Sequence, residues 1–287
     1  MMKNALVTGV SWTTGIGFAI SKQLIEDGFF VYAVYHSEDS TAKEFYEQNP
    51  NNIKFLQCDL SERESLKSLI SYFTDSDIKL DAVINNAGAF SGEEDINNYN
   101  FETWDRVFAV NVTAPLILSV GLKKQLKRNG VIINMVSTDG MKGSFSSMAY
   151  AASKAALINL TDSLAINFGY DDKKIRVTAI CPGWVKSFDE ADPSSSEMVP
   201  FISRSTGSEL CPLGRFAETF EIANVVSFLV SDKASFISGG VVPVHGGYNG
   251  VAFDMYVESG RPFEGYHPEE AIKAQMQKLE IANECTK

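Results

Sequence analysis

The stretch VTGVSWTTGIGFAI, residues 7–20, indicates the fold most directly. It places Gly9, Gly15 and Gly17 between an apolar, strand-like run and a helical pattern that ends near Asp27. Glycine at such a turn lets the backbone approach a pyrophosphate, and the N-terminus of the following helix stabilises the phosphate charge. A plain glycine-rich turn is the alternative, but the position directly after a first strand favours the nucleotide interpretation.

Outward from this turn, strand-like runs alternate with helical patterns along most of the chain. The predicted strands cover 4–8, 29–35, 53–59, 80–88, 130–137, 175–183 and 239–247. The predicted helices run from about 15 to 27, from about 40, over 61–73 with a capping box of Ser61 and Glu64, and from about 101. Runs such as VIIN and RVTAI do not alternate strictly, which is typical of strands buried on both faces. The pattern predicts an α/β, single-domain Rossmann fold, in which a doubly wound parallel seven-stranded sheet carries helices on both faces.

Length, charge and cysteine content exclude several classes of function. The chain has 287 residues, 45% of them hydrophobic, and a formal net charge of -11, which disfavours binding to nucleic acid. No apolar run approaches the roughly 18 residues of a membrane span. The first residues leave no room for a signal peptide, and the four cysteines show no CxxC spacing. We therefore expect a cytoplasmic protein without a membrane segment or a metal site.

Tyr150 and Lys154 lie four positions apart in MAYAASKAALINL, residues 148–160. On a helix this spacing puts both side chains on one face, so they can converge on one site. An adjacent ammonium stabilises tyrosinate and lowers the tyrosine pKa. Tyr150 is therefore a candidate proton donor, and Lys154 is the candidate group that lowers its pKa. Ser137 precedes Tyr150 by 13 residues, at the end of a predicted strand, where doubly wound sheets bind ligands.

Tyr170 and Lys174 repeat the same spacing in GYDDKKIRV and test how specific it is. They fall in a charged, turn-like link before the sixth strand, and the residue 13 positions before Tyr170 is Leu157, which offers no hydroxyl. We therefore expect Tyr170 at a solvated surface and assign the catalytic role to Tyr150.

With these motifs in place, the chain resembles the short-chain dehydrogenase/reductase family, in its ketoreductase-like branch, over about residues 4–248. Four motifs match in order: the glycine turn, NNAG at 85–88, Ser137 with Tyr150 and Lys154, and PGWV at 182–185. The resemblance implies an NAD(P)-dependent oxidoreductase that transfers a hydride between nicotinamide and a carbonyl or secondary alcohol, with the tyrosine as general acid/base. The glycine turn departs from the family, because five residues separate its first two glycines where three are usual. That length is similar to the enoyl-reductase branch.

The resemblance also assigns site residues by position. The implied cofactor contacts are Gly9, Ser11, Trp12, Thr14, Gly15, Ile16, Gly17, Tyr35, His36, Ser37, Asp59, Leu60, Asn86, Ala87, Gly88, Tyr150, Lys154, Pro182, Gly183 and Val185. The implied catalytic residues are Asn111, Ser137, Tyr150 and Lys154. For Asn111 the family role is support of a water chain that reaches the lysine, and the alternative is a hydrogen bond to backbone. For Asp59 the alternative is a charge at a helix N-terminus, near Ser61.

The end of the second strand bears on the choice of cofactor. NAD-dependent members usually carry an acid there for the ribose 2′-hydroxyl, whereas this chain has Tyr35. His36 and Ser37 follow and can hydrogen-bond a phosphate. We therefore expect NADP(H) to be favoured, with NAD(H) as the alternative.

Two segments lie outside the alternation of strands and helices. In a domain expected to cover 1–250, the resemblance places a substrate lid at 186–217, whose apolar side chains either line a cleft or pack the lid onto the sheet. Residues 251–287 form a C-terminal extension, which we expect to pack on the body or on a neighbouring subunit, because the family is usually dimeric or tetrameric. The candidate wall residues are Phe188, Met198 and Phe201 in the lid, with Met141, Phe145 and Trp184 outside it.

Three functions remain open at this point. The first is a reductase or alcohol dehydrogenase acting on a small-molecule carbonyl or alcohol. The second is an enoyl reductase, which the long turn favours and YAASK together with Ser137 disfavours. The third is a non-catalytic NAD(P)-binding regulatory protein, although such proteins usually lose the tyrosine or the lysine.

Overall fold

The computed structural model describes residues 2–36, 45, 47–48, 50–92, 94–144, 147–187 and 211–248. The chain divides into two compact units, one of residues 1–182 with 218–244 and the other of 183–217 with 245–287. The predicted helix from about Ser40 lies largely outside the described residues, as do Ser37, most of the lid and the C-terminal extension. The bounds predicted for the domain and its extension therefore stay predictions.

The first unit is built on a parallel sheet of seven strands in the order β3-β2-β1-β4-β5-β6-β9. Its strands are β1 (Lys3–Thr8), β2 (Phe29–Tyr35), β3 (Ile53–Gln57), β4 (Leu80–Asn85), β5 (Leu126–Met135), β6 (Arg176–Pro182) and β9 (Val241–Val244). The strand order reverses between β1 and β4, and ligands of such sheets bind at the carboxyl ends of the strands beside this switch point. The sheet confirms the predicted fold class.

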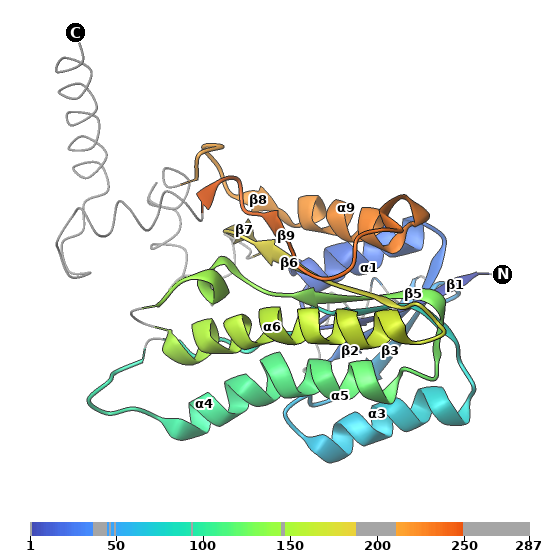
Figure 1. The fold of residues 1–287 in the computed structure, drawn as a ribbon, viewed down its shortest axis with the longest axis horizontal. Coiled ribbons are helices and arrows are strands. Elements are labelled where there is room, and N and C mark those ends of the chain that lie inside the picture. The colour runs from blue at the N-terminus through green and yellow to red at the C-terminus, as the bar shows by residue number, and fades with distance from the viewer. Residues whose placement is uncertain are drawn as a thin grey trace, which may run out of the picture. The chain divides into compact units, whose positions relative to one another are not determined.

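Helices cover both faces of this sheet (Figure 1), as the prediction of a doubly wound fold requires. Helices α1 (Ile16–Glu26) and α9 (Thr219–Val230) pack together on one face. The other face carries α3 (Arg63–Asp75), α4 (Phe101–Phe108), α5 (Ala114–Gly121) and α6 (Met148–Tyr170). Three short helices are η1 (Ala109–Thr113), η2 (Thr138–Met141) and η4 (Asp232–Ala234), and two short strands, β7 (Val185–Lys186) and β8 (Ala217–Glu218), pair with each other.

The core lies on both sides of the central strands. Ala82, Val83 and Ile84 of β4 are fully buried, as are Ile132 and Ile133 of β5. Burial on both faces explains why these strands are continuously apolar instead of alternating. The buried central strands therefore carry the loops at the carboxyl edge of the sheet, where the predicted site residues lie.

The structure differs from two local predictions, one at the start of α3 and one at the end of α6. Helix α3 begins at Arg63, and its N-cap residue Glu62 makes no side-chain capping bond, so the predicted capping box is wrong. Ser61 instead donates from both its backbone N–H and its hydroxyl to Asp59 Oδ1, at 2.9 and 2.7 Å. Tyr170 is the last residue of α6 and not part of a turn, but it is 85% exposed, which confirms its predicted place at the surface.

Several strands differ in length from the prediction. Strands β3, β4 and β9 are shorter than the predicted ranges of 53–59, 80–88 and 239–247. Strand β5 begins at Leu126, four residues earlier than predicted. The helical stretch predicted from about 101 is interrupted by η1, which is a π-helix. Within the described residues, no helix is long and apolar enough to cross a membrane.

Candidate active site

The glycine turn joins β1 to α1 at the switch point of the sheet. Gly9 has a φ of +75°, and a side-chain Cβ built on it would lie 2.7 Å from the Cα of Ala87. A Cβ on Gly17 would overlap the carbonyl oxygen of Gly9. Both glycines are thus required for the close packing of the turn against α1 and the end of β4, in addition to any contact with a ligand.

The N-terminus of α1 is suited to a phosphate group. Its N-cap residue is Gly15, which provides no side-chain cap, and no acidic residue lies in its first turn. The five-residue segment before Gly15 closes on itself, because the Gly15 N–H donates to the Trp12 carbonyl oxygen at 3.0 Å. The helix therefore presents uncapped N–H groups and the positive end of its dipole beside a glycine cradle, and these features fit the pyrophosphate of a dinucleotide.

The NNAG segment is fixed to the end of β1 through Thr8. The N–H groups of Asn86 and Ala87 both donate to Thr8 Oγ1 at 3.0 Å, and Asn86 Nδ2 donates to the Thr8 carbonyl oxygen at 2.9 Å. This arrangement places Asn86, Ala87 and Gly88 next to the glycine turn, as the prediction requires. Thr8 was not singled out from the sequence, although its place directly before the first glycine was the available signal.

His36 and Asp59, predicted separately as cofactor contacts, lie together. His36 Nε2 is 3.4 Å from Asp59 Oδ2, and both side chains are substantially exposed. Hydrogen bonds from Ser61 hold the pKa of Asp59 below its usual range, opposed in part by burial and aided by His36. The contact with Ser61 agrees with the structural alternative for Asp59, and it brings an acid close to the end of β2, near Tyr35. Leu60 beside it is buried.

Ser137, Tyr150 and Lys154 converge at the carboxyl edge of the sheet. Ser137 is the N-cap residue of η2, two residues after the end of β5, and Tyr150 lies in the first turn of α6. Lys154 is buried, its Nζ lies 5.5 Å from the centre of the Tyr150 ring, and it donates to the Met135 carbonyl oxygen at 2.8 Å. A hydrogen bond from Ser137 favours the ionised form of Tyr150. The structure thus brings together three residues that the sequence predicted as one catalytic group.

The electrostatics of this group differ from the expectation. Burial raises the pKa of Tyr150 to about 12, despite the opposing hydrogen bond from Ser137. Burial also lowers the pKa of Lys154 to about 8. Lys154 is not among the causes of the shift in the Tyr150 pKa, and desolvation is the largest cause for both groups, so the predicted lowering of the tyrosine pKa by the lysine is not seen. Tyr150 is a neutral, protonated acid at physiological pH.

Asn111 links the NNAG loop to the helix that carries Tyr150. It lies fully buried in η1, and single-turn π-helices of this kind are frequent at functional sites. Its Oδ1 accepts from the Ala89 N–H at 2.7 Å, and its Nδ2 donates to the Ala89 carbonyl and to Ser153 Oγ, both at 2.9 Å. These bonds agree with the backbone-bonding alternative, and the water chain to Lys154 stays a prediction.

The PGWV segment crosses the boundary between the two units. Pro182 ends β6 in the first unit, whereas Gly183 and Val185 belong to the second. Within the second unit, a Cβ on Gly183 would lie 2.9 Å from the Cβ of His245, so only glycine fits there. Trp184 contacts the rings of Phe216 and Tyr248, at centroid distances of 6.1 and 6.2 Å.

Two residues close to the start of α6 were not predicted from the sequence. Phe90 is half exposed, and its ring packs edge-on against the Tyr150 ring at 5.2 Å between centroids. The Glu94 carboxylate accepts from the N–H groups of Met148 and Ala149, at 2.6 and 3.0 Å, and so caps α6 from a distant loop. The place of Phe90 directly after NNAG was a signal for its role, whereas nothing local in the sequence indicates the contact of Glu94.

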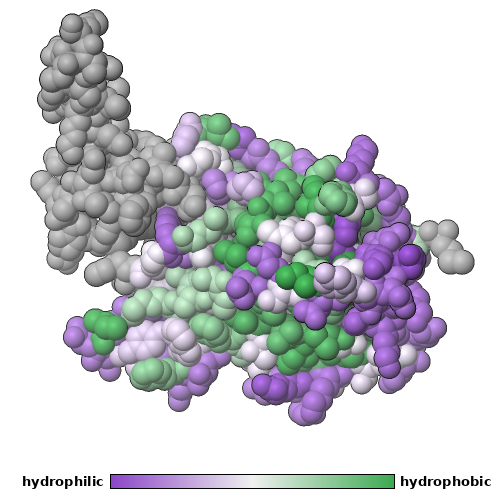
Figure 2. All heavy atoms as spheres, in the orientation of Figure 1, coloured by the Kyte–Doolittle hydropathy of each residue, from purple (hydrophilic) through white to green (hydrophobic). Residues whose placement is uncertain are grey.

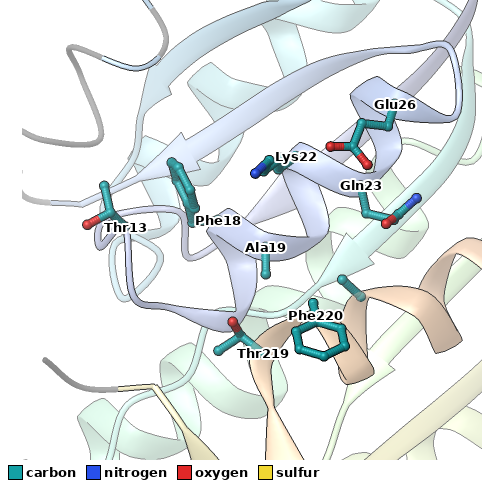
Figure 3. A pocket seen from close by; sticks show the side chains of 9 residues that line it. Thr13, Phe18, Ala19, Lys22, Gln23, Glu26, Thr219 and Phe220 are labelled. Carbon is teal, nitrogen blue, oxygen red and sulfur yellow. The ribbon is translucent and has the colours of Figure 1, made fainter.

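A surface pocket lies between α1 and α9, away from the catalytic group (Figure 3). Its lining includes Phe18 and Lys22 of α1 and Phe220 of α9, and it contains none of the predicted catalytic residues. Among the residues that the structure describes, no three His, Cys, Asp or Glu side chains are grouped as metal ligands. The candidate active site is therefore the carboxyl edge of the sheet.

Known proteins resemble this chain over most of its length. A family profile described as enoyl-(acyl carrier protein) reductase matches residues 9–249. Glucose 1-dehydrogenase 2 of Bacillus subtilis is 32% identical over 252 residues, which cover 85% of this chain and 94% of the relative. A 3-oxoacyl-[acyl-carrier-protein] reductase of Staphylococcus aureus is also 32% identical, over 86% of this chain and 98% of its own.

Solved structures show the same relationship. A short-chain dehydrogenase/reductase from Serratia marcescens superimposes with a TM-score of 0.75 at 27% identity, over 86% of this chain and 98% of its own. The chain belongs to the short-chain dehydrogenase/reductase family, and it is an NAD(P)-dependent oxidoreductase.

Proposed function

We propose that the protein reduces a small-molecule carbonyl to the alcohol, with Tyr150 as the proton donor. The observation that carries this proposal is the convergence of Ser137, Tyr150 and Lys154 beside a glycine cradle that fits a dinucleotide. The relatives named above act as dehydrogenases or as a 3-oxoacyl reductase, which favours carbonyl over enoyl chemistry. A regulator without catalysis is disfavoured because the whole catalytic group is present.

In this proposal the hydroxyl groups of Ser137 and Tyr150 bind the carbonyl oxygen. The bound nicotinamide supplies the hydride. As negative charge develops on the carbonyl oxygen, the O–H bond of Tyr150 breaks and its proton passes to that oxygen. A tyrosine with a pKa of about 12 is fully protonated beforehand, and it remains a stronger acid than the alcohol that forms. These properties favour the reductive direction near neutral pH.

Lys154 stabilises the tyrosinate that remains after the proton transfer. With a pKa of about 8, its amine is mostly protonated at pH 7. Its bond to the Met135 carbonyl oxygen holds the charge beneath the Tyr150 ring. Because the surroundings are dry, the attraction between ammonium and phenolate is stronger than it would be in water.

For the cofactor, we propose a preference for NADP(H) over NAD(H). Tyr35 stands where an acid would repel a 2′-phosphate, and His36 is exposed nearby as a hydrogen-bond donor. The Asp59 carboxylate beside His36 opposes this preference, so we expect NAD(H) to be accepted as well. The glycine turn, the N-terminus of α1 and residues Asn86–Gly88 are the contacts that either nucleotide would share.

We further propose a cytoplasmic homo-oligomer. Leu116 and Val120 of α5 and Ile166 of α6 are 38%, 54% and 61% exposed. Figure 2 shows apolar side chains gathered over these helices on the face turned to the viewer. An exposed apolar surface of this kind is typical of a contact between subunits. Sedimentation of the purified chain measures whether it is a monomer, dimer or tetramer.

The proposed reaction is tested by following the oxidation of NADPH and NADH against a panel of ketones and enoyl thioesters. Carbonyl-dependent oxidation of either cofactor supports the proposal. Oxidation that depends only on enoyl thioesters would identify an enoyl reductase, and nucleotide binding without turnover on any compound would favour a regulatory protein.

A further inference from the structure

Phe90 contacts the proposed proton donor, yet it has no role in the reaction described above. Its ring packs edge-on against the Tyr150 ring, with 5.2 Å between the ring centroids and 72° between the ring planes. Phe90 is nevertheless 52% exposed. The phenylalanine therefore contacts both the proton donor and solvent, so its contribution is not limited to filling the core.

The backbone on both sides of Phe90 is held by hydrogen bonds. Ala89 is bonded through both of its backbone groups to the Asn111 side chain, at 2.7 and 2.9 Å. The Ser147 hydroxyl donates to the Gly92 carbonyl oxygen at 3.3 Å. Phe90 thus projects from a segment that is tied to η1 on one side and to the residue before α6 on the other.

Glu94 binds the same segment to the helical turn that carries Tyr150. Its carboxylate accepts from the N–H groups of Met148 and Ala149, at 2.6 and 3.0 Å, and Tyr150 is the next residue of the helix. The loop that presents Phe90 and the turn that presents Tyr150 are therefore joined by hydrogen bonds. This connection keeps the two rings in a constant relation.

The start of this loop lies beside Lys154. A Cβ on Gly88 would lie 3.4 Å from Lys154 Nζ, which itself lies 5.5 Å from the centre of the Tyr150 ring. The loop therefore approaches the lysine at Gly88 and contacts the tyrosine at Phe90, two residues later. Both contacts are with the catalytic group, and both come from one fixed segment of backbone.

We propose that Phe90 is a positioning residue, whose ring holds the Tyr150 ring in the orientation from which its hydroxyl reaches the carbonyl oxygen. This inference rests on the proposed function, because it takes Tyr150 as the proton donor. An edge-on pair of aromatic rings has a preferred geometry, so Phe90 restricts how the tyrosine ring tilts. A misplacement of reacting groups by about 1 Å can lower a rate by about 100-fold.

The test compares the full-length wild type, Phe90→Leu and Phe90→Tyr by steady-state kcat and KM, and by single turnover of NADPH with a ketone that the wild type reduces. Leucine keeps an apolar side chain without a ring, whereas tyrosine keeps the ring. The matched control is Phe236→Leu, which changes a fully exposed phenylalanine after η4. Thermal melting of each variant shows whether it is folded.

Phe90→Leu is also made in the Tyr150→Phe background, where no hydroxyl remains to be positioned. We expect Phe90→Leu alone to lower kcat and the single-turnover rate by about 10- to 100-fold, with KM for the ketone close to wild type. The same change should have no further effect in the Tyr150→Phe background, because the effect passes through the hydroxyl. Phe90→Tyr and Phe236→Leu should both stay close to wild type.

Three results would overturn the inference and leave the proposed function intact. A raised KM for the ketone with an unchanged kcat would show that Phe90 only lines the substrate site. An equal loss with and without the Tyr150 hydroxyl would show that Phe90 does not act through it. A Phe90→Tyr variant as slow as Phe90→Leu would exclude a role for the ring. If the wild type reduces no carbonyl compound with either cofactor, the proposed function fails and this inference fails with it.

Discussion

Replacing Lys154 by methionine should change how the stability of the protein depends on pH. Burial lowers the pKa of Lys154 from 10.5 to about 8. At neutral pH the folded state therefore holds a desolvated ammonium that the unfolded chain exposes to water. Lys154→Met keeps an unbranched apolar side chain of similar length and removes the charge.

The two pKa values set the magnitude. Between pH 8 and 10.5 the unfolded state binds more protons at Lys154 than the folded state, so this residue makes stability rise with pH over that window. Each pKa unit corresponds to about 1.4 kcal/mol, so the lowered pKa destabilises the folded protein by about 3 kcal/mol at pH 7. Most of this penalty, about 2.5 kcal/mol, is gone at pH 10.

Urea unfolding of the wild type and of Lys154→Met, at pH 7 and at pH 10, measures the effect. The stability of the variant relative to the wild type should fall by about 2.5 kcal/mol between the two pH values. Other groups that titrate in this range are common to both proteins and cancel in the difference. The Met135 carbonyl loses its donor in the variant, but that cost does not depend on pH. A difference in stability that is equal at pH 7 and pH 10 would refute the burial argument.

Three further substitutions test other parts of the site. Gly17→Ala should lower the unfolding free energy by about 2 kcal/mol or more and weaken nucleotide binding, because its Cβ would overlap the Gly9 carbonyl oxygen; unaltered melting would contradict this. Glu94→Ala should cost about 1 to 2 kcal/mol, since α6 loses its anionic cap at Met148, and urea titration against wild type measures it. Tyr35→Asp should shift kcat/KM toward NADH, and a wild type much faster with NADH than NADPH would show that the end of β2 does not select the cofactor.

The sequence predicted those parts of the molecule that local patterns determine. The order of strands and helices follows from apolar periodicity, and the glycine turn follows from the spacing of Gly9, Gly15 and Gly17. The catalytic group was predicted from the shared helix face of Tyr150 and Lys154 and from Ser137 at a strand end, together with the other family motifs that match in order along the chain. These features require no knowledge of how distant segments pack.

Features that depend on packing were not predictable in the same way. His36 and Asp59 meet because β2 and β3 pair in a register that joins Tyr35 to Gln57, which no local pattern shows. Glu94 caps a helix that begins more than fifty residues later in the chain. The tyrosine pKa was predicted from its neighbour, whereas its depth in the fold determines it.

The central claim is that Tyr150 donates the proton in carbonyl reduction, and Tyr150→Phe tests it most directly. Nucleotide binding, measured by fluorescence titration of NADPH, should stay close to wild type, because only a hydroxyl is removed. In single turnover with a ketone that the wild type reduces, the rate of NADPH oxidation should fall by a factor of about 100 to 10,000. A variant that binds NADPH normally and keeps the wild-type rate would contradict the assignment of Tyr150 as the proton donor.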